Sequence, residues 1–577
     1  MWAVPRIRSA LGPLALLITV LMVSTGCVAI PTSSPPQPVQ GFNRSRPANL
    51  VPTPGRNDDP ETLVRNLVKA MSDPNSSHRA ARKFLTAGAA ERWDDQGPMT
   101  LLTDLRVVID ERNESAVRLR VIGQRVGSLS AIGQLTPTAG EEVIPMTLSK
   151  SNEVWRVDGA IPAGTVTDTV QFDASYRLAN LYFPDRTATR LVGDPRWLFG
   201  VSIDPTVVVN QVLAGPAPDL SGAVESAAGK DVVLRGPVVV DSGRISINLG
   251  GQIDVDTRKR TALAAQLIWS LNDAGISGTY LINAEGSPLI AERSDGWRTA
   301  DVMAFDPDPD TGIAGLHVVR GGLYRVSGTG LSPVGGPLGA ATDLVAAAIA
   351  VRQERVAAVA VRDGRQVLLQ GPYGGAVSEV AAGATIGTPS FGAAADTGYA
   401  IIDGRPTVWT VDADGATRVV PLDTSRVTGI SPGTITSFKV SPDGVRVALV
   451  VDGTLLLGAL GTNDRGVPAL IGVRVATYSL STPVISIAWG DTGAVYAARE
   501  GEDTPVWRVP VSGLPGVALV SGNLKPPVRT VAATRGTVYA GDVRGVLELG
   551  TAPGSADQYW LPVGQVPEGA IPVTQTS

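Results

Sequence analysis

ADTGYAIIDGRPTVWTV (395–411) holds two short apolar segments, each of which follows a tight turn. The first turn is ADTG (395–398), and the second is IDG (402–404), which precedes the segment TVWTV (407–411). Turn residues that alternate with segments rich in β-branched and aromatic residues are typical of antiparallel strands. The stretch therefore predicts a β-meander.

The same arrangement of turns recurs along the second half of the chain. The first turn of each pair begins at one of six positions that are 43 to 49 residues apart: 309, 352, 395, 441, 490 and 534. A repeat of this length with about four strands is typical of a β-propeller blade. Six pairs of turns predict an all-β propeller of six blades over residues 301–565, with seven blades as the alternative.

The end of the chain bears on how this ring is closed. The stretch DQYWLPVG (557–564) is rich in strand-forming residues. We expect it to complete the ring of blades, and we expect residues 566–577 to form a C-terminal tail.

A first α+β domain is predicted over residues 58–175. Asp59-Pro60 is a helix start, with an N-cap aspartate and a proline at the first helical position, and Ser77 is expected to cap a second helix. Segments with period-two alternation follow, and the last of them, EVWRVDG (153–159), resembles the closing strand of NTF2-like domains. The pattern predicts two helices and a meander, and the resemblance implies an NTF2-like domain, for which we favour a binding role.

A second α+β domain is predicted over residues 176–295. A helix ends at QVLAGP (211–216), the strand ISINL (245–249) follows, and a longer apolar helix covers 261–275. Together with LYF (181–183), these residues resemble the GerMN module of sporulation, germination and cell-envelope proteins. That family has no established catalytic residues, so the resemblance assigns none here.

The N-terminal residues resemble a bacterial lipoprotein signal. Residues 1–26 contain two arginines followed by an apolar stretch of 13 residues at 11–23, which is too short to span a bilayer because about 20 residues are needed. The resemblance implies a lipobox of Ser24, Thr25, Gly26 and Cys27, with cleavage between Gly26 and Cys27. Cys27 would then carry S-diacylglycerol and an N-acyl group, followed by a proline-rich tether over 27–57.

The composition restricts the chemistry that the chain can perform. The net charge is −5, so the sequence offers no basic surplus for nucleic acid. One cysteine and two histidines, His78 and His317, cannot supply the ligands of a His/Cys metal site. No nucleotide-binding or serine-hydrolase motif is present. We therefore assign no catalytic, cofactor or metal residue and expect no enzymatic activity.

The order of lipobox, tether, NTF2-like domain, GerMN module and propeller resembles the actinobacterial LpqB lipoprotein family. The resemblance implies a lipid-anchored protein on the extracytoplasmic face of the cell membrane. It also implies a partner, the extracytoplasmic domain of the sensor kinase MtrB in the MtrA–MtrB two-component system. The alternatives are a scaffold that binds peptidoglycan or another glycan, and a glycan-acting propeller enzyme, which would need acidic side chains in the central channel.

Overall fold

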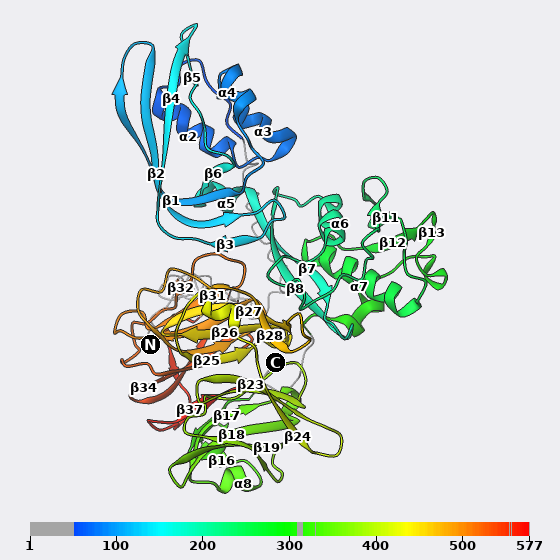
Figure 1. Cartoon of the computed structure of the whole chain (residues 1–577), viewed down its shortest axis with the longest axis vertical. Coiled ribbons are helices and arrows are strands. Elements are labelled where there is room, and N and C mark those ends of the chain that lie inside the picture. The colour runs from blue at the N-terminus through cyan, green and yellow to red at the C-terminus, as the bar shows by residue number, and fades with distance from the viewer. Residues whose placement is uncertain (1–50, 309–314, 329, 553, 555–556, 576–577) are drawn as a thin grey trace, which may run out of the picture. The chain divides into compact units, whose positions relative to one another are not determined.

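The computed structural model describes residues 51–308, 315–328, 330–552, 554 and 557–575. Two α+β domains precede an all-β domain built of four-stranded sheets (Figure 1). Each domain buries its own clusters of apolar side chains. The predicted fold class is confirmed.

The helices of the first domain begin at polar caps. In α2 (Pro60–Ala70), the Asp59 carboxylate accepts hydrogen bonds from the amides of Glu61 and Thr62, both at 3.0 Å, as the sequence predicts. The prediction for Ser77 is wrong, because Ser77 lies inside α3 (Asn75–Arg82) with a left-handed φ of 54°. A third helix that the sequence analysis missed, α4 (Ala87–Arg92), is capped by Thr86.

These helices pack on a six-stranded sheet with the order β5-β4-β2-β1-β6, and β3 pairs with β2. Leu63, Phe84 and Trp93 from the helical segments share a core cluster with Val121 and Leu148 of the sheet. The connecting helix α5 (Thr169–Ser175) leads to the second domain. The strands are β1 (Met99–Arg112), β2 (Ala116–Leu129), β3 (Leu135–Pro137), β4 (Glu141–Ser151), β5 (Val154–Val157) and β6 (Thr165–Asp168).

The second domain combines a hairpin, two helices and a five-stranded sheet. The long helix α7 (Thr257–Asp273) connects two strands that pair in parallel, as a βαβ unit requires. The sheet has the order β10-β11-β12-β13, and β9 also pairs with β11. The remaining elements are β7 (Tyr176–Pro184), β8 (Leu191–Phe199), α6 (Pro205–Ala214), β9 (Val233–Leu234), β10 (Val239–Asp241), β11 (Arg244–Gly250), β12 (Thr279–Ala284) and β13 (Ser287–Pro288).

A buried ion pair lies in this second domain, in β8 and close to the end of α6. Arg196 and Asp194 are almost fully buried, and an Arg196 guanidinium nitrogen lies 2.6 Å from an Asp194 carboxylate oxygen. The same carboxylate accepts a hydrogen bond of 2.7 Å from the amide of Ala217. Arg196 also donates to the carbonyl of Gly215 at 3.3 Å, which ties the loop after α6 to the strand.

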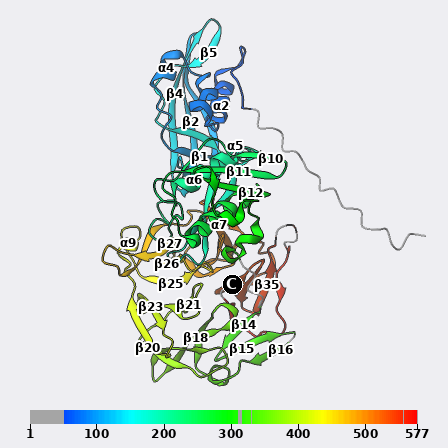
Figure 2. The same ribbon diagram turned by 90° about the vertical axis from the view of Figure 1, so that its right-hand side faces the viewer.

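Residues 315–575 form six four-stranded sheets in the part of the chain that the structure describes, and these sheets surround a common axis (Figures 1 and 2). The number equals the number of turn pairs in the sequence. Each sheet is antiparallel throughout. The first of the predicted turns, at 309–312, lies outside the described residues.

From inner to outer strand, the sheets are β37 (Ile571–Val573), β14 (His317–Arg320), β15 (Gly322–Ser327) and β16 (Gly330–Pro333); β17 (Leu344–Ile349), β18 (Arg355–Arg362), β19 (Arg365–Pro372) and β20 (Ser378–Gly383); β21 (Ser390–Phe391), β22 (Thr397–Ile402), β23 (Arg405–Val411) and β24 (Thr417–Pro421); β25 (Ile435–Val440), β26 (Arg446–Val451), β27 (Thr454–Thr462) and β28 (Pro468–Val475); β29 (Val484–Trp489), β30 (Ala494–Arg499), β31 (Val506–Pro510) and β32 (Val517–Ala518); and β33 (Thr530–Thr534), β34 (Thr537–Asp542), β35 (Gly545–Gly550) and β36 (Leu561–Pro562).

The turns within the sheets explain the recurring Asp-Gly pairs. Asp403 and Gly404 both have positive φ, 49° and 77°, as a type I′ hairpin turn requires. The Asp403 carboxylate also accepts hydrogen bonds from the amides of Ala384 and Thr385, at 2.8 and 2.9 Å. Asp452 repeats the second role by accepting from the amide of Thr434 at 3.1 Å. Each aspartate therefore shapes a turn and also fixes the segment that enters its sheet.

The ring of sheets is closed by a strand other than the predicted one. The stretch 557–564 contains β36, which pairs with β35 as the outermost strand of its sheet. The inner strand of the first sheet is β37, which pairs antiparallel with β14 and contacts both β17 and β33. The prediction that residues 566–577 form a tail is therefore wrong for 571–573, because Val573 is buried between the sheets.

Candidate functional site

The predicted lipobox, Ser24, Thr25, Gly26 and Cys27, lies outside the described residues, so lipidation at Cys27 stays a prediction. Among the residues that the structure does describe, no helix is both long and apolar enough to cross a membrane. The described residues also contain no group of three His, Cys, Asp or Glu side chains that could hold a metal ion.

The two histidines lie in different domains, as expected from the sequence. The Nδ1 atom of His78 lies 3.1 Å from the Asp95 carboxylate in the first domain. Burial alone would raise the pKa of Asp95, but the hydrogen bonds from His78, Gln96 and Arg82 outweigh it and lower this pKa to about 2. The Nε2 atom of His317 lies 2.6 Å from the hydroxyl of Tyr373 in the propeller. Neither arrangement places a nucleophile beside the imidazole in the way a catalytic triad does.

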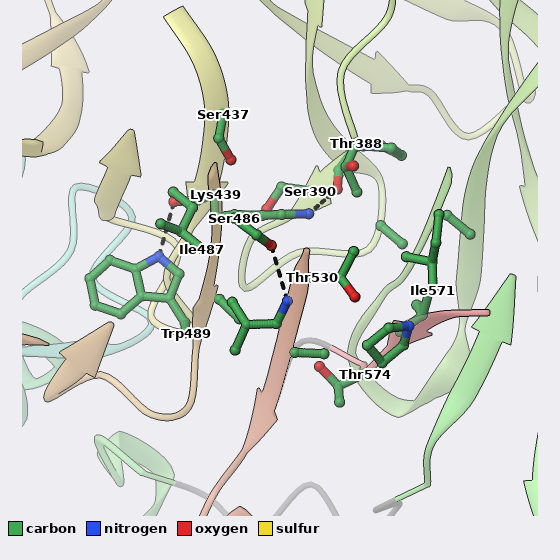
Figure 3. A pocket seen from close by; sticks show the side chains of 18 of the residues that line it. Thr388, Ser390, Ser437, Lys439, Ser486, Ile487, Trp489, Thr530, Ile571 and Thr574 are labelled. Carbon is green, nitrogen blue, oxygen red and sulfur yellow. Dashed lines mark hydrogen bonds between the residues drawn. The ribbon is translucent and has the colours of Figure 1, made fainter. Parts of the chain in front are cut away.

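A cavity of about 250 Å³ lies where the inner strands of all six sheets converge (Figure 3). Each inner strand contributes one short segment, so residues that lie far apart in the sequence come together. Hydroxyl groups from five of these segments make much of the lining polar. They belong to Thr388, Ser390, Thr436, Ser437, Ser486, Thr530 and Thr574.

Lys439 is the one lysine that lines this cavity. It extends from β25 toward the neighbouring sheet (Figure 3), where its ammonium donates a hydrogen bond of 2.9 Å to the carbonyl of Pro389. The carbonyl of Lys439 accepts a hydrogen bond of 2.9 Å from the indole of Trp489, so its backbone is also held in place. Burial lowers the pKa of the Lys439 ammonium to about 8.

Two serine hydroxyls connect adjacent sheets at the cavity wall. Ser390 accepts a hydrogen bond of 3.0 Å from the amide of Val440. Ser486 accepts one of 3.1 Å from the amide of Val531 (Figure 3). Because these bonds link neighbouring inner strands, they fix the positions of the polar groups around the cavity.

Gln575 completes the lining at the end of β37. Its side chain is 5% exposed, and its Oε1 atom has no hydrogen-bond partner among the described residues. A buried amide oxygen without a partner is costly, by about 1–3 kcal/mol. Because water does not reach this Oε1 atom, the unpaired acceptor lies behind the cavity wall and not on its surface.

The residues that line the cavity include Lys439 and the exposed Arg529 but no aspartate or glutamate within the described part of the chain. A propeller enzyme that hydrolyses glycans with a pair of carboxylates needs both acids at the bond that is cleaved. The cavity lacks that pair and offers cations and hydroxyls in its place. Its chemistry is suited to holding a polar molecule.

The fold and this cavity define a multidomain protein, in which two α+β modules precede a propeller with a polar channel. The family models agree with this division. The "Lipoprotein LpqB, N-terminal domain" matches residues 53–173, "Sporulation and spore germination" matches 180–290, and the "Lipoprotein LpqB beta-propeller domain" matches 321–574.

The chain belongs to the LpqB lipoprotein family. It is 33% identical to lipoprotein LpqB of Rhodococcus opacus, over 98% of both chains. It is 34% identical to the Mycolicibacterium smegmatis relative, over 96% of this chain and 99% of that one, and 33% identical to the Mycobacterium tuberculosis relative, over 97% and 98%. Among solved structures, a chain of the nidogen/laminin complex matches 45% of this chain and 98% of that one, at 12% identity and a TM-score of 0.34.

Proposed function

We propose that this lipoprotein binds the extracytoplasmic domain of the sensor kinase MtrB and modulates its signalling to cell-envelope and division genes. The observation that carries the proposal is the match to LpqB lipoproteins over nearly the whole chain. The kinase as partner is part of the proposal and comes from the resemblance to this family. The protein would act by contact rather than by catalysis, which fits a channel whose described lining has no acid pair.

The anchor would be the lipid on Cys27, which would hold the protein on the extracytoplasmic face of the cell membrane. A diacylglyceryl group supplies two acyl chains at once, and two chains give stable anchoring where one does not. Confinement to the same membrane raises the effective concentration of the partner, so a weak interface is sufficient. A Cys27→Ala chain that still carried labelled fatty acid would contradict this anchor.

For the contact itself, we propose the free edge of the second domain's sheet. The strand β10 lies at that edge, and its residues Val239 and Val240 are 52% and 54% exposed. Val233 of the adjoining strand β9 is also exposed, at 53%. An exposed edge strand with apolar side chains can receive a strand from another protein.

The test compares two variants of the full-length chain reconstituted with the kinase in liposomes. Val239→Lys/Val240→Lys places charges on the edge and should weaken binding to the sensor domain at least tenfold. Val419→Lys/Val517→Lys, at exposed valines of the outer propeller strands β24 and β32, is the matched control and should leave binding unchanged. If the native chain neither bound the sensor domain nor altered autophosphorylation, the proposed function would fail. If both variants bound like the native chain, only the assignment of the edge would fail.

A second function, a scaffold that binds an envelope glycan, is favoured by the polar, cation-containing channel. Pull-down on isolated cell wall separates the two functions. Retention of the native chain on cell wall, together with no binding to the kinase, would favour the scaffold.

A further inference from the structure

We propose that the channel of the propeller binds a small anionic ligand that also carries hydroxyl groups, in the class of an acidic monosaccharide. Lys439 would hold its carboxylate or phosphate, and the hydroxyls of Ser437, Thr530 and Thr574 would form hydrogen bonds with its hydroxyl groups. This site is separate from the proposed contact with the kinase, and the inference does not rest on that contact.

The first argument for an anionic ligand is the positive charge of the lining. An ammonium can donate three hydrogen bonds, and the carbonyl of Pro389 is the one acceptor that Lys439 reaches in the described chain. Arg529 adds a second positive charge to the lining, and no described lining residue is acidic. A half-buried cation without an opposite charge is unfavourable, and the lowered pKa of Lys439 expresses that cost. A bound anion would supply the missing charge.

The second step follows from the hydroxyls of the lining. Ser437, Thr530 and Thr574 line the cavity and can each donate or accept a hydrogen bond. A simple anion such as chloride has no proton to donate to them. A ligand that uses these groups as well as the cations needs hydroxyls beside its negative charge.

The size of the cavity carries the third step. A cavity of about 250 Å³ is smaller than the sites of about 300–1,000 Å³ that hold drug-sized molecules. It is the size expected for one sugar ring.

Isothermal titration of the full-length protein in detergent tests the inference with three probes. Glucuronate presents a carboxylate, glucose 6-phosphate presents a phosphate, and glucose is the neutral match. At least one acidic probe should bind ten times more tightly than glucose, and whichever binds better identifies the anionic group. Equal affinity for all three probes, or no binding of either acidic probe, would overturn the proposal.

Two variants of the same chain locate the binding. Lys439→Gln should weaken the better acidic probe at least tenfold, and Thr530→Val should weaken it about fivefold through loss of a hydroxyl that lines the cavity. Lys525→Gln, at an exposed lysine outside the lining of the cavity, should change nothing. An unchanged affinity in a folded Lys439→Gln protein would place binding elsewhere and refute the site.

A chemical measurement on the native chain covers the case in which Lys439→Gln does not fold. Reductive methylation near pH 8 should modify Lys439, because burial lowers the pKa of its ammonium to about 8 and leaves a large fraction of it uncharged at that pH. Saturating acidic probe should slow modification of Lys439 at least fivefold and leave Lys525 unaffected, as read by peptide mass spectrometry. Equal modification of Lys439 with and without probe would also refute the site.

Discussion

The closure of the propeller should be sensitive to acid because of His317. This histidine is fully buried in β14, the strand that pairs with the closing strand β37, and His317 itself lies opposite Val573. Burial lowers the pKa of its imidazole from 6.5 to about 4, and Arg325 acts in the same direction. In the folded protein the imidazole is therefore uncharged at pH 5, whereas in the unfolded chain it binds a proton below pH 6.5.

The direction and the size of the change in the free energy of unfolding follow from proton linkage. The unfolded state binds more protons than the folded state between pH 6.5 and 4, so stability falls as the pH falls through this window. With those two pKa values, the free energy of unfolding should decrease by about 2 kcal/mol between pH 7.5 and pH 5. That corresponds to roughly a 30-fold increase in the population of molecules in which β37 is detached from β14.

Hydrogen exchange measured by mass spectrometry on peptides of β14 and β37 is the assay. Because intrinsic exchange rates also depend on pH, the native chain is compared with His317→Gln at each pH, and glutamine can still bond to the Tyr373 hydroxyl. The difference in opening free energy should change by about 2 kcal/mol from pH 7.5 to pH 5.

The chain provides its own control, since it contains only two histidines. His78→Gln, in the first domain, should leave the behaviour of these peptides unchanged. A difference between the native chain and His317→Gln that stays constant over the whole range would refute the argument. A pH dependence lost equally in His78→Gln would refute it as well.

Three further predictions concern other parts of the fold. Asp194→Ala should destabilise the second domain by about 3–5 kcal/mol, since it leaves Arg196 buried and unpaired; urea unfolding should show that Asp194→Leu/Arg196→Met recovers most of this loss. The first domain should lose stability as the pH falls from about 4 to 2, because the lowered pKa of Asp95 stabilises the fold only above that window. This loss should be absent in Asp95→Asn, and hydrogen exchange of α2 peptides measured over an acid titration tests it. Deletion of 571–577 should cost roughly 3–5 kcal/mol through one buried valine and the lost strand pairing, and calorimetry should show a lower melting temperature for the propeller alone.

Much of this fold could be predicted because local chemistry repeats. A turn such as Asp403-Gly404 needs positive φ at both positions, and few residue types accept that conformation. The spacing of such turns therefore reveals the blades. The capped start of α2 is equally local, since Asp59 and its partners lie within three residues of each other.

The rest depends on contacts that no local pattern contains. The closing strand pairs residues 571–573 with residues 317–319, more than 250 positions away, and the aromatic stretch at 557–564 has the stronger strand pattern. The left-handed turn at Ser76 to His78 is held by side chains such as Arg82, which donates to the carbonyl of Ser77 at 2.8 Å. A serine near the start of a predicted helix does not by itself indicate this left-handed turn.

The cavity was also beyond sequence analysis, because its polar side chains come from five separate segments of the chain. The one local signal is Lys439 itself, which stands between two buried residues, Phe438 and Val440, in an otherwise uncharged strand. A lysine in such a position indicates a polar interior. Without the arrangement of the blades, however, nothing shows that Gln575 lies in the same cavity.

Closure by β37 also makes the channel depend on the integrity of the ring. This strand pairs with β14 as the inner strand of the first sheet. Its residues 571–573 also form part of the channel wall. The first sheet and the channel are therefore completed by the same three residues. A chain in which β37 detaches from β14 would have an open ring and an incomplete channel at the same time.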